Sequence, residues 1–399
     1  MSKVSKAAAA SSMDVALAAI KAQDSALYKR SRVDLRGDER LLISAVSTGS
    51  IVLNHLIGGT QVDGNWVCPG YPRGRITEIY GGESSGKSTL GVHACAEAVR
   101  SGGSAAYIDY EHTFSHSYAQ SIGLDLDSPN FSLWQPLTWE EGTSILVNMQ
   151  KANVDVVVND SVSAMTPAKM LDVKLDETPP IGLLARLQSN FLAKFVGPLG
   201  NSQTAVIYIN QVRSNIKTSK YDAGPAEDTS GGRALKFYSS LRLKLQRIAS
   251  EKANITDGLT GRRDKIEICN VVAVQGVKNK IDRRQFHKAI INIRYGEGID
   301  NIRSILDIAI LRGLIKKNGG WYVYDGPRDP FERLNGIEVV RAYMGTHPDA
   351  FTDIQNQLVS YLSSGSGKLD TSSLTDEEIA MEQEAEMVDD ASDVVAEES

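Results

Sequence analysis

The stretch Arg75-Ile-Thr-Glu-Ile-Tyr-Gly-Gly-Glu-Ser-Ser-Gly-Lys-Ser88 decides the fold. Its first six residues predict a strand, and a helical pattern follows as far as Arg100. Between them, Gly81 to Ser88 fits G-x-x-x-x-G-K-S in the strand–turn–helix context that a phosphate-binding loop requires. Glycines let backbone N–H groups close around phosphates at a helix N-terminus, where the helix dipole favours anions. The stretch therefore predicts a nucleoside triphosphate site.

The loop residues expected around the phosphates are Gly81, Gly82, Glu83, Ser84, Ser85, Gly86, Lys87, Ser88 and Thr89. Lys87 is expected to reach the β- and γ-phosphates, and the Ser88 hydroxyl is expected to ligate Mg²⁺. The motif is specific for a triphosphate, but it does not indicate what hydrolysis drives.

The region from about residue 41 to residue 298 alternates short apolar runs with helical patterns. Strands are expected at 105–109, 154–159 and 204–210, and helices at 140–152 and 182–196. This alternation predicts βαβ crossovers, a mostly parallel central sheet and an α/β fold. Runs of period 2 at 239–248 and 290–295 predict antiparallel extensions with one solvated face.

Two carboxylates are placed to act on the phosphates. Asp160 follows the apolar run 154–159, and Glu111 follows the run 105–109. Ligands of open α/β sheets lie beyond the carboxyl ends of the strands, where the phosphate loop also lies. Asp160 is therefore expected to hold Mg²⁺ through water, and Glu111 to orient the attacking water. The alternative for Glu111 is a helix-capping acid.

Two smaller units flank this core. Residues 1–40 contain a predicted helix at 14–27, which is expected to dock on the core or on a neighbouring subunit. Residues 299–364 predict a small α/β domain. Its expected elements are helices at 302–312, 336–344 and 351–362, and a strand at 321–324.

The net charge of −6 hides an uneven distribution. Residues 376–399 hold eleven acidic side chains and no Lys or Arg, so residues 1–375 carry 43 basic and 38 acidic groups, a net of +5. Residues 365–399 are expected to form a disordered acidic tail. Two interpretations stay open: a self-repelling solvated segment, or a competitor of phosphates for the basic surface of the body.

Composition excludes several classes of protein. No apolar run approaches the roughly 18–20 residues of a membrane span, and the N-terminus lacks a secretory pattern. No membrane partner is expected. Cys68, Cys95 and Cys269 form no C-x-x-C pair, so buried free thiols in a reducing cytoplasm are expected rather than zinc or disulfides.

A series of motifs over residues 40–362 resembles the RecA family of bacterial and bacteriophage recombinases. In order, the motifs are Ser47–Ser50, Gly74–Ser88, Tyr107–His112, Val158–Pro167, Ile209–Arg213, Gly231–Tyr238, Val277–Lys280 and Tyr295–Gly298. Many proteins share the phosphate loop, and very few share the series. The resemblance implies a P-loop NTPase core of RecA type that uses ATP and Mg²⁺.

The implied activity is that of an ATP-dependent DNA recombinase. Such a protein forms a helical filament of identical subunits on single-stranded DNA, pairs that strand with homologous double-stranded DNA, and hydrolyses ATP when DNA is bound. The implied setting is recombination, DNA repair and the SOS response in the cytoplasm. Single-strand-binding and loading proteins are further implied partners.

The resemblance also implies roles for single residues. Glu111 resembles the catalytic carboxylate, Tyr118 the residue that stacks on adenine, and Gln211 the sensor of the γ-phosphate. Lysines that reach a neighbour's phosphates across the subunit interface match Lys278 and Lys280. Further interface positions match Lys236, Phe237 and Arg242.

Two stretches, about 168–181 and 213–232, follow strands, lack periodicity and are expected to bind DNA. Basic groups neutralise phosphates, and apolar side chains wedge between bases. The candidate DNA-binding residues are Ile181, Arg213, Ile216, Lys217, Lys220, Gly231 and Gly232. Arg186, on the helix after the first stretch, matches a DNA-contacting arginine of the family. Without the resemblance, solvated loops are the favoured interpretation. In the C-terminal domain, Lys316 and Lys317 beside Trp321 and Tyr322 predict a duplex-facing patch or a solvated face.

Three features depart from the family pattern. Arg233 replaces an Asn, Ser115 stands where an Asp helps to hold adenine, and the stretch Gln61–Pro69 is longer than usual. They indicate a divergent member and leave a phage origin open.

Two rival functions remain. A ring-forming RecA-fold helicase or ATPase acting on DNA needs an arginine finger, where this chain has Lys278 and Lys280. A non-catalytic regulator that binds ATP as a switch does not need the intact set of Lys87, Glu111 and Asp160.

Overall fold

The computed structural model describes residues 12–25, 42–62, 65–171, 182–214, 227–256, 263–282 and 287–363. The chain divides into two units, residues 1–41 and residues 42–399. In the first unit, α1 spans Ser12–Gln23, so the helix begins two residues before the expected start and ends four residues before the expected end. The predicted acidic tail lies outside the described residues.

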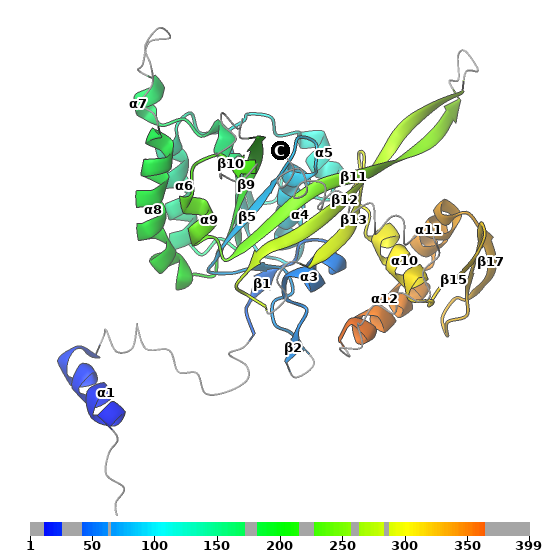
Figure 1. Cartoon of the computed structure of the whole chain (residues 1–399), viewed down its shortest axis with the longest axis horizontal. Coiled ribbons are helices and arrows are strands. Elements are labelled where there is room, and N and C mark those ends of the chain that lie inside the picture. The colour runs from blue at the N-terminus through cyan, green and yellow to red at the C-terminus, as the bar shows by residue number, and fades with distance from the viewer. Residues whose placement is uncertain are drawn as a thin grey trace, which may run out of the picture. The chain divides into compact units, whose positions relative to one another are not determined.

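The described part of the second unit is built on a ten-stranded sheet, in the order β14-β13-β12-β11-β5-β9-β8-β6-β7, with β10 paired to β9. Figure 1 labels β5 and β9–β13 of this sheet. The strands are β5 (Ile76–Gly81), β6 (Ala105–Asp109), β7 (Phe131–Trp134), β8 (Val156–Asp160), β9 (Ala205–Ser214), β10 (Glu227–Thr229), β11 (Leu241–Thr256), β12 (Arg263–Asn279), β13 (Lys288–Arg294) and β14 (Gly298–Ile299).

The sheet has a parallel half and an antiparallel half. Strands β5, β9, β8, β6 and β7 pair in parallel, and β12, β13 and β14 pair antiparallel. The mostly parallel α/β fold is therefore confirmed. β11 joins the halves, because it is parallel to β5 and antiparallel to β12.

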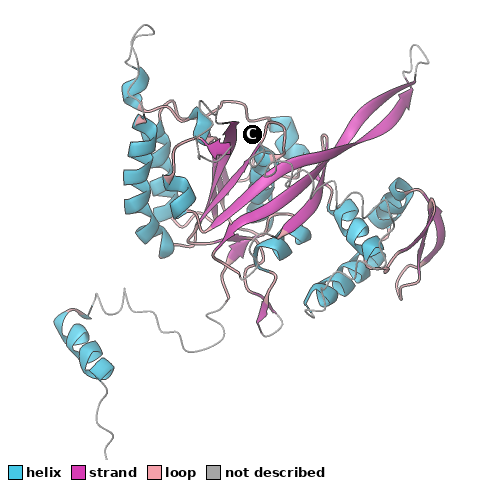
Figure 2. Ribbon diagram, in the orientation of Figure 1, coloured by secondary structure: helices cyan, strands magenta, loops and turns pink. Residues whose placement is uncertain are grey.

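Helices cover both faces of the sheet, and Figure 2 shows the resulting layers. One face packs on α3 (Ile51–Gly58), α4 (Lys87–Arg100) and α5 (His116–Ser121), and the other on α6 (Trp139–Lys151), α8 (Leu183–Gly200) and α9 (Ala234–Tyr238). Strand alternation explains the two cores: Val156 and Val158 of β8 face the first, and Val157 faces the second. Each core therefore fixes strand register from its own side.

Residues 299–364, which the sequence predicts to form a C-terminal domain and which keep that name below, contain a third cluster of buried apolar side chains. The domain contains α10 (Asn301–Leu311), β15 (Lys316–Asn318), β16 (Trp321–Tyr324), β17 (Phe331–Asn335), α11 (Ile337–Thr346) and α12 (Pro348–Ser363). The expected helices and the expected strand at 321–324 are present, and β15 and β17 complete the small sheet.

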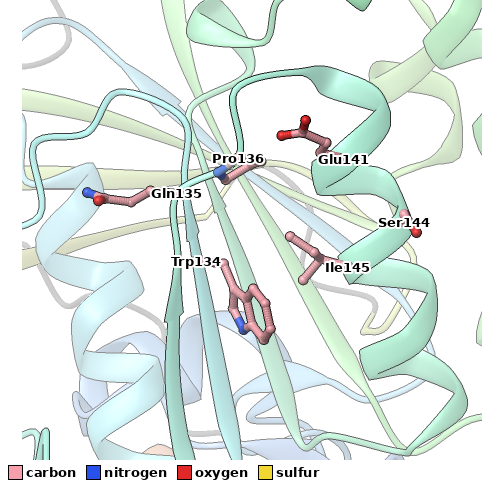
Figure 3. Close-up of a pocket in the computed structure, with 6 residues that line it drawn as sticks. All are labelled: Trp134, Gln135, Pro136, Glu141, Ser144 and Ile145. Atoms are coloured by element: carbon pink, nitrogen blue, oxygen red, sulfur yellow. The ribbon is translucent and has the colours of Figure 1, made fainter.

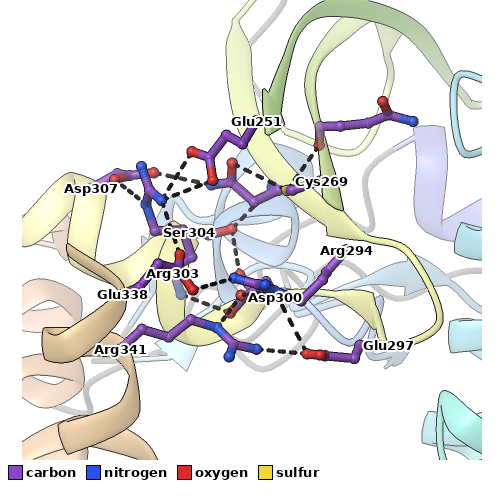
Figure 4. A network of polar contacts seen from close by, with 12 residues as sticks. Glu251, Cys269, Arg294, Glu297, Asp300, Arg303, Ser304, Asp307, Glu338 and Arg341 are labelled. Atoms are coloured by element: carbon purple, nitrogen blue, oxygen red, sulfur yellow. Dashed lines mark hydrogen bonds and ion pairs between the residues drawn. The ribbon is translucent and has the colours of Figure 1, made fainter. Parts of the chain in front are cut away.

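A network of charges joins this domain to the sheet (Figure 4). Arg341 of α11 contacts Asp300 and lies 2.7 Å from Glu297, measured from Nη2 to Oε2. Arg294 Nη2 of β13 lies 2.7 Å from Glu338 Oε2 of α11. Ion pairs therefore link α11 to β13 and to the segment between β13 and α10.

Short elements complete the described core. β1 (Ala45–Val46) pairs with β4 (Tyr71–Pro72), and β2 (Gln61–Val62) pairs with β3 (Asn65–Trp66). Both strands β2 and β3 lie within the stretch Gln61–Pro69. Cys68, Cys95 and Cys269 are free and buried, as expected. Among the described residues, no helix has the length and apolar content that a membrane span requires.

Candidate nucleotide and DNA site

The loop between β5 and α4 has the shape of a phosphate cradle. Gly86, the residue before α4, is left-handed with φ 89°, and in the described structure no side chain caps it. A Cβ there would lie 2.2 Å from Ile293 Cδ1, and a Cβ on Gly81 would lie 2.3 Å from Leu245 O. The left-handed backbone at Gly86 and the backbone oxygen beside Gly81 favour glycine at these two positions. The first N–H groups of an α-helix have no partner within the helix, so those of α4 can bind an anion.

Lys87 lies at the start of α4, close to three carboxylates. Its Nζ donates a hydrogen bond to Gly82 O at 2.5 Å. Burial lowers the pKa of Lys87, although the charges of Asp160, Glu111 and Glu83 act to raise it. A phosphate would supply the negative charge that this partly buried ammonium needs, so the residue fits its predicted role.

Asp160 ends β8 and is buried. It accepts hydrogen bonds from Ser88 and from Tyr107 Oη, the second at 2.6 Å. Burial raises the pKa of Asp160, and these two hydrogen bonds oppose the rise. The structure thus brings together the two residues predicted to hold Mg²⁺.

This donor set fits Mg²⁺ rather than a metal held wholly by protein. Within the described ranges, no group of three or more His, Cys, Asp and Glu side chains forms a metal site. Mg²⁺ commonly takes one or two protein ligands, water and substrate phosphates. A hydroxyl and a carboxylate beside a phosphate loop meet that requirement.

Glu111 and Gln211 are in contact, although 100 residues separate them in the sequence. Gln211 Nε2 donates to Glu111 Oε1 at 3.2 Å, and the Ser161 hydroxyl donates to the same oxygen. Glu111 N in turn donates to Asp109 Oδ1 at 3.1 Å. Ser115 rather than Glu111 caps α5, so Glu111 remains directed at the nucleotide edge.

Tyr118, the predicted adenine contact, lies on α5. Its hydroxyl is 3.0 Å from Thr89 Oγ1 of α4, and burial raises the pKa of this phenol. The bond connects the predicted adenine side to the helix that carries the phosphate loop.

Lys278 and Lys280 lie away from the phosphate loop of their own subunit. Lys278 of β12 pairs with Arg242 of β11, and Leu245 of β11 pairs with Gly81 at the start of the phosphate loop. Arg242 precedes Leu245 by three residues, so Lys278 lies about three residues along the sheet from the loop. Lys278 Nζ donates to Lys236 O at 2.6 Å and to Phe237 O at 3.0 Å. Burial lowers the pKa of Lys278, and the charges of Lys280 and Arg242 add to this.

The three predicted interface residues differ in exposure. Phe237 is 71% exposed, whereas the Arg242 side chain is only 11% exposed. Arg242 Nε lies 2.5 Å from Oε2 of the buried Glu78, and its guanidinium lies 4.6 Å from the centroid of the Tyr80 ring. Arg242 therefore braces its own subunit, while Phe237 projects from α9 beside Lys236.

The predicted DNA-binding residues are only partly described. Ile181, Ile216, Lys217 and Lys220 lie outside the described residues, and Arg213 is described only as backbone within β9. β9 runs past Gln211 and pairs with β10, so these two strands flank residues 215–226. Arg186 is exposed near the start of α8.

The Gly231–Gly232 turn rests on α8. The two glycines have φ of 83° and 77°, and a Cβ on Gly232 would lie 2.7 Å from Ala185 Cβ. The turn therefore lies next to the part of α8 that carries Arg186, which brings two of the predicted DNA-contacting elements together.

Sequence reasoning did not single out several anchors of the site. Asn210 Nδ2 donates to Glu78 Oε1 at 2.9 Å and to Ser230 O at 3.0 Å, and so ties β5, β9 and the Gly–Gly turn together. Ser161 and Tyr107 hold Glu111 and Asp160. Ser161 directly follows Asp160, and this position is a sequence signal that could have identified it.

A pocket of about 410 Å³ lies at the β7 edge, lined by Trp134, Gln135, Pro136, Glu141, Ser144 and Ile145 (Figure 3). Gln135 Nε2 donates to Asp109 Oδ2 at 3.0 Å, which links the pocket rim to the carboxylate cluster. None of the predicted site residues lines this pocket, so the nucleotide edge is a separate feature.

A family model described as the RecA N-terminal domain matches residues 12–300. This chain belongs to the RecA family. Similar proteins include Protein RecA of Staphylococcus carnosus, 36% identical over 340 residues, which cover 85% of this chain and 87% of that protein. Protein RecA of Corynebacterium pseudotuberculosis is 37% identical over 372 residues, 92% of this chain and 91% of that protein. In this RecA-family chain the matched domain ends one residue before α10.

Among solved structures, the crystal structure of the RadB recombinase aligns at 20% identity with a TM-score of 0.43, covering 64% of this chain and 98% of that one.

Proposed function

We propose that this RecA-family chain is an ATP-dependent DNA recombinase that forms a helical filament on single-stranded DNA and pairs it with a homologous duplex. The contact between Gln211 and Glu111 carries the proposal. The Gln211 side chain touches the carboxylate that acts on water, and its strand β9 leads into the predicted DNA-binding stretch at about 213–232. Strand β9 therefore connects the nucleotide site to the predicted DNA-binding stretch.

Hydrolysis uses the groups gathered around Lys87. Lys87 exchanges its bond to Gly82 O for the β- and γ-phosphates, where its charge is compensated. Ser161 and Gln211 hold Oε1 of Glu111, which leaves Oε2 to accept a hydrogen bond from the attacking water. Ser88, and Asp160 through water, would hold Mg²⁺, which would neutralise part of the phosphate charge.

Gln211 couples the nucleotide to DNA. A γ-phosphate offers a charged acceptor to the second N–H of the Gln211 amide, beside Glu111, and the response of β9 passes to β10 through their pairing. β10 leads into Ser230 and the Gly231–Gly232 turn, which Asn210 anchors. With ATP bound, these parts take the arrangement that grips a DNA strand, and hydrolysis releases it.

Subunit assembly uses the opposite end of the same strands. Lys278 and Lys280 reach the phosphates of a neighbouring subunit, because they lie away from their own loop. The exposed Phe237 supplies an apolar interface contact, and Arg242 holds β11 in place through Glu78. A closed ring is the disfavoured alternative, since lysines stand where a ring ATPase uses an arginine finger. Electron microscopy distinguishes a closed ring from a DNA-dependent filament.

The C-terminal domain is proposed to capture duplex DNA. Lys316, Lys317 and the 38% exposed Trp321 share its small sheet, and the Arg333 guanidinium lies 4.1 Å from the centroid of the Trp321 ring. Basic groups of this kind contact phosphates without reading sequence. Homology is then tested by base pairing between strands.

The proposed setting is the cytoplasm of a bacterium, or of an infected host if the protein is encoded by a phage. DNA repair and the SOS response are the proposed context, with single-strand-binding and loading proteins as further partners. Buried free thiols agree with a reducing compartment.

The experiment measures binding to a fluorescent oligothymidylate by anisotropy with a slowly hydrolysed ATP analogue, with ADP and with no nucleotide. Tight binding is expected with the ATP analogue alone, and Lys87→Ala should abolish that difference. Lys151→Ala, on the exposed end of α6, is the matched control and should preserve it. Equal binding in all three states contradicts the proposal. Strand exchange with homologous against heterologous duplex then tests the reaction itself.

A further inference from the structure

Gln188 occupies a core position on α8 that an apolar residue would normally fill. The buried face of this helix consists of Leu183, Gln188, Leu192, Phe195 and Leu199. Gln188 is 1% exposed, and neither Oε1 nor Nε2 has a hydrogen-bond partner among the residues that the structure describes. A side-chain amide offers two N–H donors and one acceptor oxygen, so its whole bonding capacity is unused here.

A buried amide without hydrogen-bond partners lowers the free energy of unfolding, and a single substitution would remove this cost. A buried polar atom without a partner loses its bonds to water and gains nothing in return. Met or Leu would fill the same space without that cost. Native interiors seldom keep an amide in this condition, so its presence calls for a physical reason.

The neighbours of Gln188 supply the reason. A Cβ on Gly231 would lie 2.7 Å from Gln188 Oε1 and 2.6 Å from Val162 Cγ1, so the amide oxygen, the Gly–Gly turn and Val162 are in direct contact. Val162 begins the 3₁₀ turn η2 (Val162–Ala164), directly after Ser161, which binds Glu111. Arg186 lies two residues before Gln188 on α8.

Gln188 therefore lies where the nucleotide edge and two predicted DNA elements meet. We propose that Gln188 is a positioning residue that hydrogen-bonds the peptide groups of the Gly231–Gly232 turn when ATP and DNA are bound, and so favours the gripping arrangement. The proposal rests on the proposed recombinase function and names the regulation of the same site.

The two glycines allow the turn to change conformation and form this hydrogen bond. Both hold left-handed backbone at φ 83° and 77°, and residues without a Cβ change φ and ψ at little cost. A small rotation of the turn brings a peptide N–H or C=O to the amide. The amide is left without a partner in one state and bonded in the other, so it biases the equilibrium toward the second state.

Gln188→Met is the decisive variant, because Met keeps the volume and removes the bonding groups. Its affinity for oligothymidylate with the slowly hydrolysed ATP analogue should fall about tenfold, the effect of losing roughly one hydrogen bond. Affinity with ADP should not change, and the thermal unfolding midpoint of the free protein should stay equal or rise. A lower midpoint with unchanged nucleotide dependence would show that the amide is only structural.

Gln150→Met is the matched control. Gln150 is a buried amide in the same helical layer, and its Nε2 donates to Pro198 O of α8 at 3.2 Å. This variant should lower the unfolding midpoint and leave the ratio of the two affinities unchanged. An equal loss of ATP-dependent binding in both variants would overturn the assignment to Gln188.

Hydrogen exchange of the peptide spanning residues 229–235 gives a second readout that does not depend on the variant's affinity. In the wild type, the ATP analogue with saturating DNA should slow exchange at the Gly–Gly turn, and in Gln188→Met the slowing should be absent. Equal slowing in both proteins would refute the proposed bond. If wild-type protein shows no nucleotide-dependent DNA binding at all, the proposed function fails instead, and the two outcomes are distinguishable.

Discussion

Charged groups are arranged in opposite ways at the nucleotide edge and at the junction with the C-terminal domain. At the junction, burial acts to lower the pKa of Arg294, but the bond to Glu338 and the nearby carboxylates raise it overall. At the nucleotide edge, burial lowers the pKa of Lys87 and raises that of Asp160, so each charged form is disfavoured. At the junction, Arg and carboxylate side chains of the chain stabilise one another's charged forms. At the nucleotide edge, the charged forms of Lys87 and Asp160 need a bound phosphate and metal ion to become favourable.

Glu111→Gln, at the nucleotide edge, should give the largest effect of the variants compared, a loss of ATP turnover. The variant keeps the shape of the side chain and removes the base, so steady-state ATP turnover with DNA should fall by about 100-fold or more. Binding of ATP and of single-stranded DNA should remain, because Lys87, Ser88 and Asp160 are intact. Release of phosphate, measured with an enzyme-coupled assay, is the readout.

Glu297→Gln is the matched control at the junction, where Glu297 is 56% exposed and pairs with Arg341. It should leave turnover within twofold of wild type, since an exposed pair contributes only about 0–1 kcal/mol. Normal turnover in Glu111→Gln would refute the assignment of the catalytic carboxylate.

The same substitution, Asp→Asn, should have opposite effects on stability in the two regions. The Asp300 side chain is 3% exposed, contacts Arg341 and Arg294, and caps α10 by accepting from Arg303 N at 2.9 Å. Asp300→Asn keeps the cap but removes one counter-charge from two partly buried guanidinium groups, which retain Glu297 and Glu338, so the free energy of unfolding should fall by about 2 kcal/mol.

Asp160→Asn should keep or raise the free energy of unfolding, because burial disfavours the Asp160 carboxylate in the free protein. It should nevertheless weaken Mg²⁺-dependent nucleotide binding. Urea unfolding of both variants, without nucleotide, provides the comparison. Equal destabilisation would contradict the view that the two regions differ.

The sequence alone was enough to predict the strands and loops whose signal is local. The run Val156–Val158 is buried on both faces, and the phosphate loop is a continuous motif, so neither needs a partner to be recognised. β10 is different, because its three residues are a strand only through pairing with β9. β12 was not expected either, since register shifts at three points of its pairing with β11 interrupt a simple alternation along the β11–β12 ribbon.

Contacts between residues far apart in the sequence are a second feature that the sequence alone does not predict. Glu111 and Gln211 each carried a predicted role, but no local pattern shows that their side chains meet, because the contact depends on β6, β8 and β9 being neighbours. Gln188 reads as one polar residue in an apolar helical stripe. Its importance depends on Gly231, 43 residues later, which only the folded chain brings beside it.

The smallest expected effects concern an exposed charge pair, Lys316 and Asp325 in the C-terminal domain. Lys316 Nζ lies 2.6 Å from Asp325 Oδ2, with the side chains 70% and 62% exposed. Water screens such a pair, so Lys316→Ala and Asp325→Asn should each change the free energy of unfolding by less than about 1 kcal/mol. Measurements of stability alone therefore cannot show whether Lys316 serves the structure, as the charges at the junction do, or a ligand, as those at the nucleotide edge do.

Duplex binding should separate the two variants, because phosphates and Asp325 compete for the same ammonium. If Lys316 contacts duplex DNA, Lys316→Ala should weaken duplex affinity by roughly twofold to fivefold and reduce the slope of log affinity against log salt by about one unit. Asp325→Asn frees Lys316 and should strengthen duplex binding by a similar factor. Titration of a fluorescent duplex at several salt concentrations measures both. A decrease in both variants, or no change in either, would show that this lysine belongs to a solvated face and that the charges of the C-terminal domain serve its structure alone.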